Sequence, residues 1–129
     1  MLKQKPKILL VEDDQLLAEL TSFRLELLDY EVVVEHDCER AFDTISDNHF
    51  DLVIIDLEMH GIGGLELINR LQDSNTIEAT RILATSIDAD LDVVQRAYEA
   101  GAMDYLVTPY DPMILEQKIE NLLHKPVTV

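Results

Sequence analysis

The chain has little cysteine, few basic residues and no long apolar run. Cys38 is the only cysteine among 129 residues, so no internal disulfide can form. Asp and Glu outnumber Lys and Arg by 26 to 10, and a formal net charge of −16 argues against direct binding to a nucleic-acid backbone. The first residues, MLKQKPK, lack the apolar stretch of a secretory signal, and no segment approaches the roughly 18 apolar residues of a membrane span. These absences predict a cytoplasmic chain that contacts neither nucleic acid nor membrane directly.

The remaining composition is that of a folded protein. Hydrophobic residues make up 47% of the chain and charged residues 28%, and 129 residues is about the size of one domain with a core of its own. We therefore expect a single domain over residues 1–129. The segment 124–129 is expected to be a tail or the start of a linker to a further domain.

Short apolar runs alternate with segments of helical spacing. Strands are predicted at 8–11, 32–34, 52–55, 82–84 and 105–107, and helices at 16–27, 41–45, 65–71, 91–98 and 114–123. The runs are continuously apolar, as in strands that are buried on both faces of a parallel sheet. Strands and helices that alternate through the whole length predict an α/β fold, a five-stranded parallel doubly wound sheet with five helices.

Residues at the expected helix ends agree with this pattern. Asp14, Asp37, Asp88 and Asp111 each precede a helical segment, where a carboxylate can accept hydrogen bonds from free backbone N–H groups. Gly101 follows a helical segment and suits a left-handed cap. Three glycines between the third strand and the next helix predict a flexible, sterically open loop: Gly61, Gly63 and Gly64.

Two of the apolar runs end abruptly in carboxylates. The run at 8–11 is followed by Glu12 and Asp13, and the run at 52–55 by Asp56. Because parallel strands end at the same edge of a sheet, these acids are expected to lie together, and crowded carboxylates favour a hard divalent cation such as Mg²⁺. An alternative reading is that Asp56 caps a helix and that the acids after the first run form a solvated turn. Hydroxyl groups follow the fourth strand at the same edge, at Thr85 and Ser86.

Three stretches, ILLVEDD, DLVIIDLEMHGIGGLEL and EAGAMDYLVTPYDPMILEQKIENLL, carry a resemblance to a known family. In this order and at these separations, the chain resembles the receiver domains of two-component response regulators, the CheY-like superfamily, over roughly Lys7 to Leu123. The resemblance implies a flavodoxin-like receiver fold and a role in phosphorelay signal transduction. It also implies a regulatory phosphoprotein that is not an enzyme beyond Mg²⁺-dependent autophosphorylation and self-dephosphorylation.

The resemblance assigns a phosphorylation site by position. Asp56 matches the phospho-accepting aspartate, and Glu12 and Asp13 match the acidic pair that binds Mg²⁺, for which Mn²⁺ can substitute. Asp56 and the backbone carbonyl of Glu58 complete the expected metal ligands. Ser86 matches the switch hydroxyl, with neighbouring Thr85 as the alternative if the register slips by one residue.

Further assignments concern the response to phosphorylation. Tyr105 matches the aromatic residue that changes rotamer when the phosphoryl group draws Ser86 inward. The family usually has Lys-Pro after the fifth strand, and this chain has Thr108-Pro109. A threonine offers a shorter, neutral donor in place of an ammonium, and no nearby cation is expected to compensate, because Arg81 lies at the opposite end of its strand. His60 stands where the family usually has proline and brings an ionisable group close to the phosphoryl position.

Three functions remain open at this point. The first is a phosphorylation-dependent switch, which receives its phosphoryl group from a histidine kinase or a histidine phosphotransfer protein and acts on an effector domain or a downstream protein. A homodimer through the fourth helix, fifth strand and fifth helix, around Tyr98, Tyr110 and Met113, is an expectation by analogy. The second is a degenerate receiver that binds partners without phosphorylation, with Thr108 as its mark. The third, a phosphotransferase or phosphatase with Glu58 as acid/base, is disfavoured because the chain lacks room for a substrate-cap domain.

Overall fold

A computed structural model describes residues 4–74 and 80–125, in which strands and helices alternate along the chain. The elements are β1 Lys7–Val11, α1 Gln15–Leu27, β2 Glu31–Glu35, α2 Cys38–Asp47, β3 Leu52–Asp56, α3 Gly63–Asp73, β4 Arg81–Ser86, α4 Leu91–Ala100, β5 Asp104–Val107 and α5 Pro112–His124. Each predicted strand and helix is present, and most extend one or two residues beyond the predicted range.

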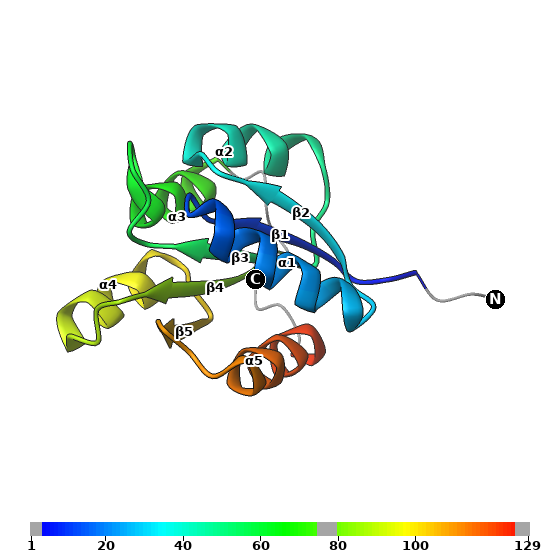
Figure 1. The fold of residues 1–129 in the computed structure, drawn as a ribbon. Coiled ribbons are helices and arrows are strands. Elements are labelled where there is room, and N and C mark those ends of the chain that lie inside the picture. Colours follow the sequence, from blue (N-terminus) through cyan, green and yellow to red (C-terminus); the bar gives the residue numbers. More distant parts are fainter. Residues whose placement is uncertain (1–3, 75–79, 126–129) are drawn as a thin grey trace.

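All five strands are parallel and follow the order β2-β1-β3-β4-β5 (Figure 1). The predicted α/β doubly wound fold with five helices is therefore confirmed. We call the side of the sheet where the strands end the carboxyl edge, and the opposite side the amino edge. In the register of the sheet, Val11 pairs with Ile55, and Asp56 pairs with Thr85, so the acidic strand ends lie at the carboxyl edge.

The sheet separates two hydrophobic cores. Helices α2, α3 and α4 cover one face, where Ile45, Leu67 and Ala97 are buried, and α1 and α5 cover the other, where Leu25 and Ile119 are buried (Figure 1). Alternate residues of a strand point to opposite faces. The central strands therefore supply both cores and are apolar at nearly every position.

Helix α1 does not bury the residues that predict it. Leu16, Leu20, Phe23 and Leu27 have the spacing of a core-facing stripe, yet they are between 61% and 72% exposed. The residues that α1 buries against the sheet and α5 are instead Ala18, Thr21 and Leu25. Two of these are small, so the helix lies close to the sheet and its larger side chains face solvent.

Capping aspartates begin three helices as predicted. The side chains of Asp14, Asp37 and Asp111 accept backbone N–H bonds at the first turns of α1, α2 and α5. Gly101 ends α4 with φ +131°, a backbone conformation that side chains rarely adopt. These contacts satisfy backbone groups that a helix end leaves free.

The prediction of a cap at Asp88 is wrong. Helix α4 begins at Leu91, and Asp90 occupies the N-cap position. Asp88 is held in the loop instead: its N–H donates to the Ser86 hydroxyl and its carbonyl accepts from the Tyr105 hydroxyl. These contacts keep Asp88 in the loop, while the helix itself begins at Leu91 as predicted.

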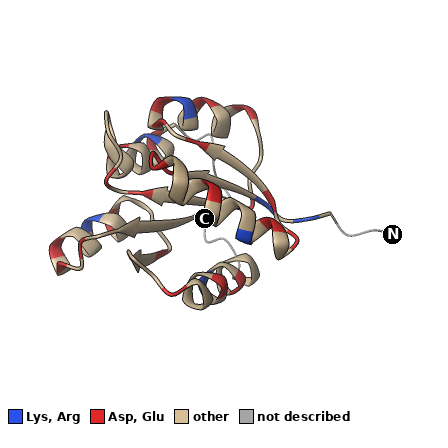
Figure 2. Cartoon of the chain, viewed as in Figure 1, with Lys and Arg blue, Asp and Glu red and all other residues tan. Residues whose placement is uncertain are grey.

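Acidic residues are spread over the helices and loops of both faces, with few Lys or Arg between them (Figure 2). Within residues 4–74 and 80–125, no helix is both long enough and apolar enough to cross a membrane. The predicted tail at 124–129 overlaps α5 at His124, and residues 126–129 lie outside the described residues.

Candidate functional site

Three carboxylates meet at the carboxyl edge of the sheet. Glu12 and Asp13 follow β1, Asp56 is the last residue of β3, and one oxygen from each lies within 4.8 Å of the others. Glu12 is buried, with 7% of its surface exposed, while Asp13 and Asp56 are half-buried. The structure thus brings together the three acidic side chains that the strand ends predict.

The crowding changes how these acids ionise. Burial, a hydrogen bond with Asp56 and the charges of Asp56 and Asp13 raise the pKa of Glu12 to about 8. Burial also raises the pKa of Asp56, although hydrogen bonds from the Glu58 N–H and from Glu12 oppose the shift. Burial alone would raise the pKa of Asp13, but the His60 side chain and backbone N–H lower it overall. Burial and crowding therefore disfavour the ionised forms of Glu12 and Asp56.

This arrangement fits a divalent metal. Mg²⁺ prefers oxygen ligands, and a cation among the carboxylates would offset the burial and the neighbouring charges that raise the pKa of Glu12. Glu12, Asp13 and Asp56 are the residues that would hold it. The expected contribution of the Glu58 carbonyl stays a prediction, because the contacts shown for Glu58 are those of its N–H and its carboxylate.

The loop after Asp56 lies tightly against that residue. The Glu58 N–H donates to Asp56 Oδ1 at 2.9 Å, and a Cβ added to Gly64 would lie 2.3 Å from the Asp56 carbonyl oxygen. The predicted open loop is therefore wrong at Gly64, where the missing side chain lets α3 begin against the Asp56 backbone. Gly61 and Gly63 do have open space, and both have positive φ.

The switch hydroxyl predicted at Ser86 lies beside this loop. Ser86 is fully buried, and its hydroxyl donates to Glu58 Oε2 at 2.5 Å. The Ile87 N–H donates to the other oxygen, Oε1, at 2.7 Å. Thr85, the alternative, is also buried, and its carbonyl accepts from the Leu57 N–H at 2.8 Å.

Tyr105 and Thr108 extend the site along β5. Tyr105 is 8% exposed, and its hydroxyl donates to the Asp88 carbonyl at 2.7 Å. The Thr108 N–H donates to the Ser86 carbonyl at 2.7 Å, so the backbones of the two residues are neighbours. Thr108 directly follows β5 at the carboxyl edge, in the position where the resemblance calls for a lysine, and the Tyr105 hydroxyl reaches the loop after β4.

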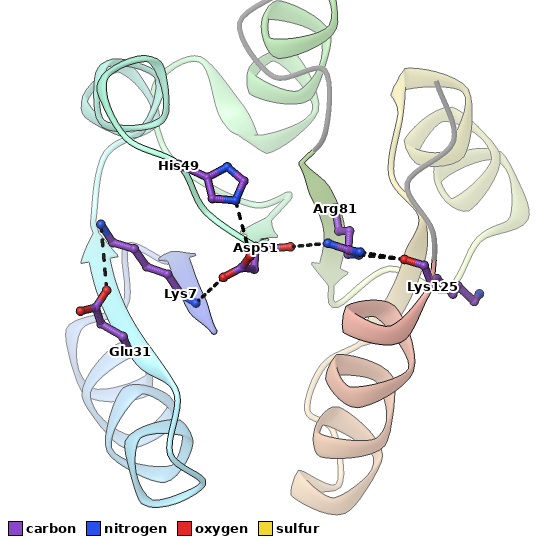
Figure 3. Close-up of polar contacts among 6 residues, drawn as sticks. All are labelled: Lys7, Glu31, His49, Asp51, Arg81 and Lys125. Atoms are coloured by element: carbon purple, nitrogen blue, oxygen red, sulfur yellow. Dashed lines mark hydrogen bonds and ion pairs between the residues drawn. The ribbon is translucent and has the colours of Figure 1, made fainter. Parts of the chain in front are cut away.

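Two basic side chains that could replace the missing lysine, those of Arg81 and Lys118, are engaged in other contacts. Arg81 is at the amino edge, where its guanidinium donates to the Lys125 carbonyl at 2.8 Å and to the Asp51 carbonyl at 3.4 Å (Figure 3). Lys118 pairs with Asp104 at 3.0 Å. Neither supplies the charge that Thr108 lacks.

Two histidines join the acidic group, and sequence reasoning pointed to only one of them. His60 Nδ1 lies 2.5 Å from Asp13 Oδ2, so its imidazole is beside the acidic group, as its place in the loop suggests. His36 Nδ1 lies 2.9 Å from the Glu12 carbonyl and was missed. His36 directly follows β2, which pairs with β1, so the rule that strand ends share an edge could have found it.

Comparisons with known proteins agree with this geometry. A family model described as the response regulator receiver domain matches residues 8–120. The transcriptional regulatory protein CrdR of Helicobacter pylori is 33% identical over 118 residues, covering 92% of this chain and 55% of that protein. The transcriptional regulatory protein CpxR of Escherichia coli is 34% identical over 119 residues, covering 92% of this chain and 50% of that protein. The chain thus spans about half the length of these curated relatives.

Solved structures show the same fold. A putative response regulator from Chloroflexus aurantiacus superposes with a TM-score of 0.85 at 32% identity, covering 94% of this chain and 99% of that one. The receiver domain of a Francisella response regulator has a TM-score of 0.86 at 24% identity, covering 92% and 97%. The chain therefore belongs to the family of response regulator receiver domains.

Proposed function

We propose that the chain is a phosphorylation-dependent switch whose phosphoryl acceptor is Asp56. The observation that carries the proposal is the three-carboxylate group, which places Asp56 beside Glu12 and Asp13 with a buried hydroxyl, Ser86, on the neighbouring strand. A histidine kinase or a histidine phosphotransfer protein supplies the phosphoryl group, and an effector domain or downstream protein reads the result. The relatives named as transcriptional regulators support a regulatory role rather than an enzymatic one.

The chemistry starts from the ionised form of Asp56. One carboxylate oxygen attacks the phosphorus in line, the bond from phosphorus to the donor nitrogen breaks, and the donor imidazole leaves with that electron pair. A bound Mg²⁺ would neutralise charge on the phosphoryl oxygens and keep the acids ionised. The Glu58 N–H, 2.9 Å from Asp56 Oδ1, orients the acceptor. Attack by water on the acyl phosphate later returns the carboxylate and releases inorganic phosphate.

The test uses acetyl phosphate and Mg²⁺ with the intact mass as the readout. We expect one phosphoryl adduct on the unmodified chain and none on Asp56→Asn. Asp73→Asn is the matched control, because Asp73 is exposed on α3 and the change removes the same charge. An adduct that persists in Asp56→Asn would move the acceptor to another residue.

A second function, a constitutive interaction module, is favoured by one observation: Thr108 occupies the place of the usual lysine, and Arg81 and Lys118 are engaged elsewhere. The same experiment separates the two functions. If neither acetyl phosphate nor beryllofluoride with Mg²⁺ binds the unmodified chain, the switch is excluded and the interaction module remains.

We also propose that copies of the chain associate through α4, β5 and α5. Leu91, Tyr98 and Met113 are 77%, 44% and 61% exposed on these elements. Tyr110 does not belong to this face, because it is half-buried and its hydroxyl bonds to Thr21 of α1. Sedimentation velocity with and without beryllofluoride tests the dimer: the heavier species should be lost in Leu91→Gln, and its persistence there would place the interface on another face.

A further inference from the structure

The carboxylate of Glu58 accepts hydrogen bonds from two donors near Asp56, the proposed phosphoryl acceptor. Ser86 Oγ donates to one of its oxygens at 2.5 Å, and the Ile87 N–H donates to the other at 2.7 Å. Both donors lie at the end of β4, one and two residues beyond Thr85, which pairs directly with Asp56. A phosphoryl group on Asp56 would carry its oxygens into the neighbourhood of these same donors, since adjacent strands are only about 4.8 Å apart.

A continuous set of hydrogen bonds runs from Glu58 to β5. The Ser86 hydroxyl that donates to Glu58 also accepts from the Asp88 N–H at 3.0 Å. The Asp88 carbonyl accepts from the Tyr105 hydroxyl at 2.7 Å, and Tyr105 is 8% exposed. The position of Glu58 is thereby connected to the position of the Tyr105 ring.

The chemistry of the contact is that of an anion and two donors. A carboxylate, like a phosphoryl group, offers oxygens that accept charge-assisted hydrogen bonds. Thr108 supplies no ammonium that would draw an anion away from Ser86, and Lys118 is paired with Asp104. The Glu58 carboxylate is therefore the anion that holds the Ser86 hydroxyl in place.

We propose that Glu58 is a positioning residue that substitutes for the phosphoryl group: in the unphosphorylated chain it holds Ser86, the loop after β4 and Tyr105 in the arrangement that phospho-Asp56 would otherwise stabilise. The proposal rests on Asp56 being the phosphoryl acceptor and adds a regulation of that site. Phosphorylation must displace the Glu58 carboxylate from Ser86, so it exchanges one anion for another. The consequence is a small change at Tyr105 when the unmodified chain is phosphorylated.

The test follows the Tyr105 ring by NMR, with its resonances assigned by their absence in Tyr105→Phe. Without phosphodonor or metal, the unmodified chain should show a buried ring, and Glu58→Ala should shift it toward the position of a solvent-exposed tyrosine. Adding beryllofluoride and Mg²⁺ should restore the buried ring in Glu58→Ala. In the unmodified chain, the same addition should shift the Tyr105 resonances at least several-fold less. Glu66→Ala, which removes an equal charge from an exposed pair with Arg70 on α3, is the control and should leave Tyr105 unchanged.

A Tyr105 spectrum that is the same in Glu58→Ala and the unmodified chain, before any beryllofluoride is added, would overturn the proposal. Failure of Asp56 as the acceptor has a different signature: Glu58→Ala still shifts Tyr105, but beryllofluoride does not restore it. Glu58→Gln provides a conservative second variant, because the amide keeps the shape of the side chain and should give an intermediate shift.

A double-mutant cycle with Ser86→Ala tests whether Glu58 acts through Ser86. Ser86→Ala removes the hydroxyl that joins Glu58 to Asp88, so Glu58→Ala should have little further effect on Tyr105 in that background. Additive shifts would show that Glu58 reaches Tyr105 by another route and would overturn the assignment of this network.

Discussion

Thr108 is the residue at which the site departs most from the family pattern. We expect Thr108→Lys to increase the conformational change caused by beryllofluoride. The Thr108 backbone adjoins Ser86, so a lysine ammonium there could pair with the Glu58 carboxylate in the free chain and move to the anion when it binds. A charge-assisted contact of this kind contributes about 1.5–3 kcal/mol. The measurement is the sum of NMR shift changes on α4 and β5, with Thr108→Gln as a neutral control of similar length. Equal changes in the two variants would show that charge at this position does not matter.

Gly64 lies where no other residue fits without movement. In Gly64→Ala the new Cβ would be 2.3 Å from the Asp56 carbonyl oxygen and 2.8 Å from the Leu57 Cα, so backbone must shift. We expect the free energy of unfolding to fall by about 1–3 kcal/mol, the usual cost of overpacking, with slower phosphorylation of Asp56. Chemical denaturation measures the first effect.

Gly61→Ala separates this crowding from backbone strain. Gly61 has φ +82° but nothing within 4 Å of an added Cβ, so only the strained backbone opposes the change. We expect a loss of about 1 kcal/mol with phosphorylation unaffected. A larger loss at Gly61 than at Gly64 would contradict the role given to the close approach of α3.

At this scale the sequence predicts positions better than contacts. Glu12, Asp13 and Asp56 are brought together because each follows a strand, and parallel strands end at one edge. The Glu58 contact with Ser86 could not be predicted, because it depends on side-chain rotamers and on the path of a loop. The family resemblance assigns a role only to the backbone carbonyl of Glu58, as a metal ligand, whereas the structure shows its carboxylate bonded to Ser86 and Ile87.

Helix α1 has two apolar faces, and only one of them contributes to stability. Leu25 is fully buried, so Leu25→Ala should lower the free energy of unfolding by about 2–5 kcal/mol. Leu20 is 61% exposed, so Leu20→Gln should change it by no more than about 0.5 kcal/mol. Urea denaturation of the two variants measures the contrast. A large loss in Leu20→Gln would mean that the predicted stripe does face the core in solution.

Sequence periodicity locates this helix but cannot choose its face. Leucines occur on both sides of α1, so the spacing of the large residues is as regular as that of the buried ones. Small residues, Ala18 and Thr21, decide the outcome because they permit close approach to the sheet. The cap of α4 was mispredicted for a related reason: Asp88 has the sequence of a cap but is engaged by Ser86 and Tyr105.

The acidic edge couples the stability of the whole chain to pH and metal. The pKa of Glu12 is raised from 4.5 to about 8, so the folded chain binds this proton more tightly than the unfolded chain does. The contribution of Glu12 is therefore fully present below about pH 4.5 and is lost as the pH rises through about 8. In EDTA, we expect the free energy of unfolding to fall over this range more steeply than in Glu12→Gln.

Mg²⁺ should oppose that loss, because it binds the ionised carboxylates of the folded chain and stabilises it by mass action. Thermal unfolding at pH 5 and pH 8, with and without Mg²⁺, measures the effect. Stabilisation that is no greater at pH 8 than at pH 5, or that persists in Glu12→Gln, would contradict the assigned ligands.

The topology of the whole molecule was the most predictable property. Alternating strands and helices leave few arrangements other than a parallel sheet with helices on both faces, and the apolar character of β1, β3 and β4 requires cover on both sides. Local errors at α1 and at Asp88 did not change this result, because the pattern of burial is redundant over five repeating units.

The exposed leucines of α1 also govern how the protein behaves in concentrated solution. A net charge of −16 keeps copies apart at low salt, where screening extends to about 30 Å at 0.01 M. At about 1 M salt the screening length falls to about 3 Å, so the apolar side chains of α1 can meet without opposition. We expect the second virial coefficient to change sign from repulsive to attractive as salt is added, and to remain repulsive in Leu20→Gln, as static light scattering would show. The protein would then stay dispersed in dilute buffer and self-associate at high salt.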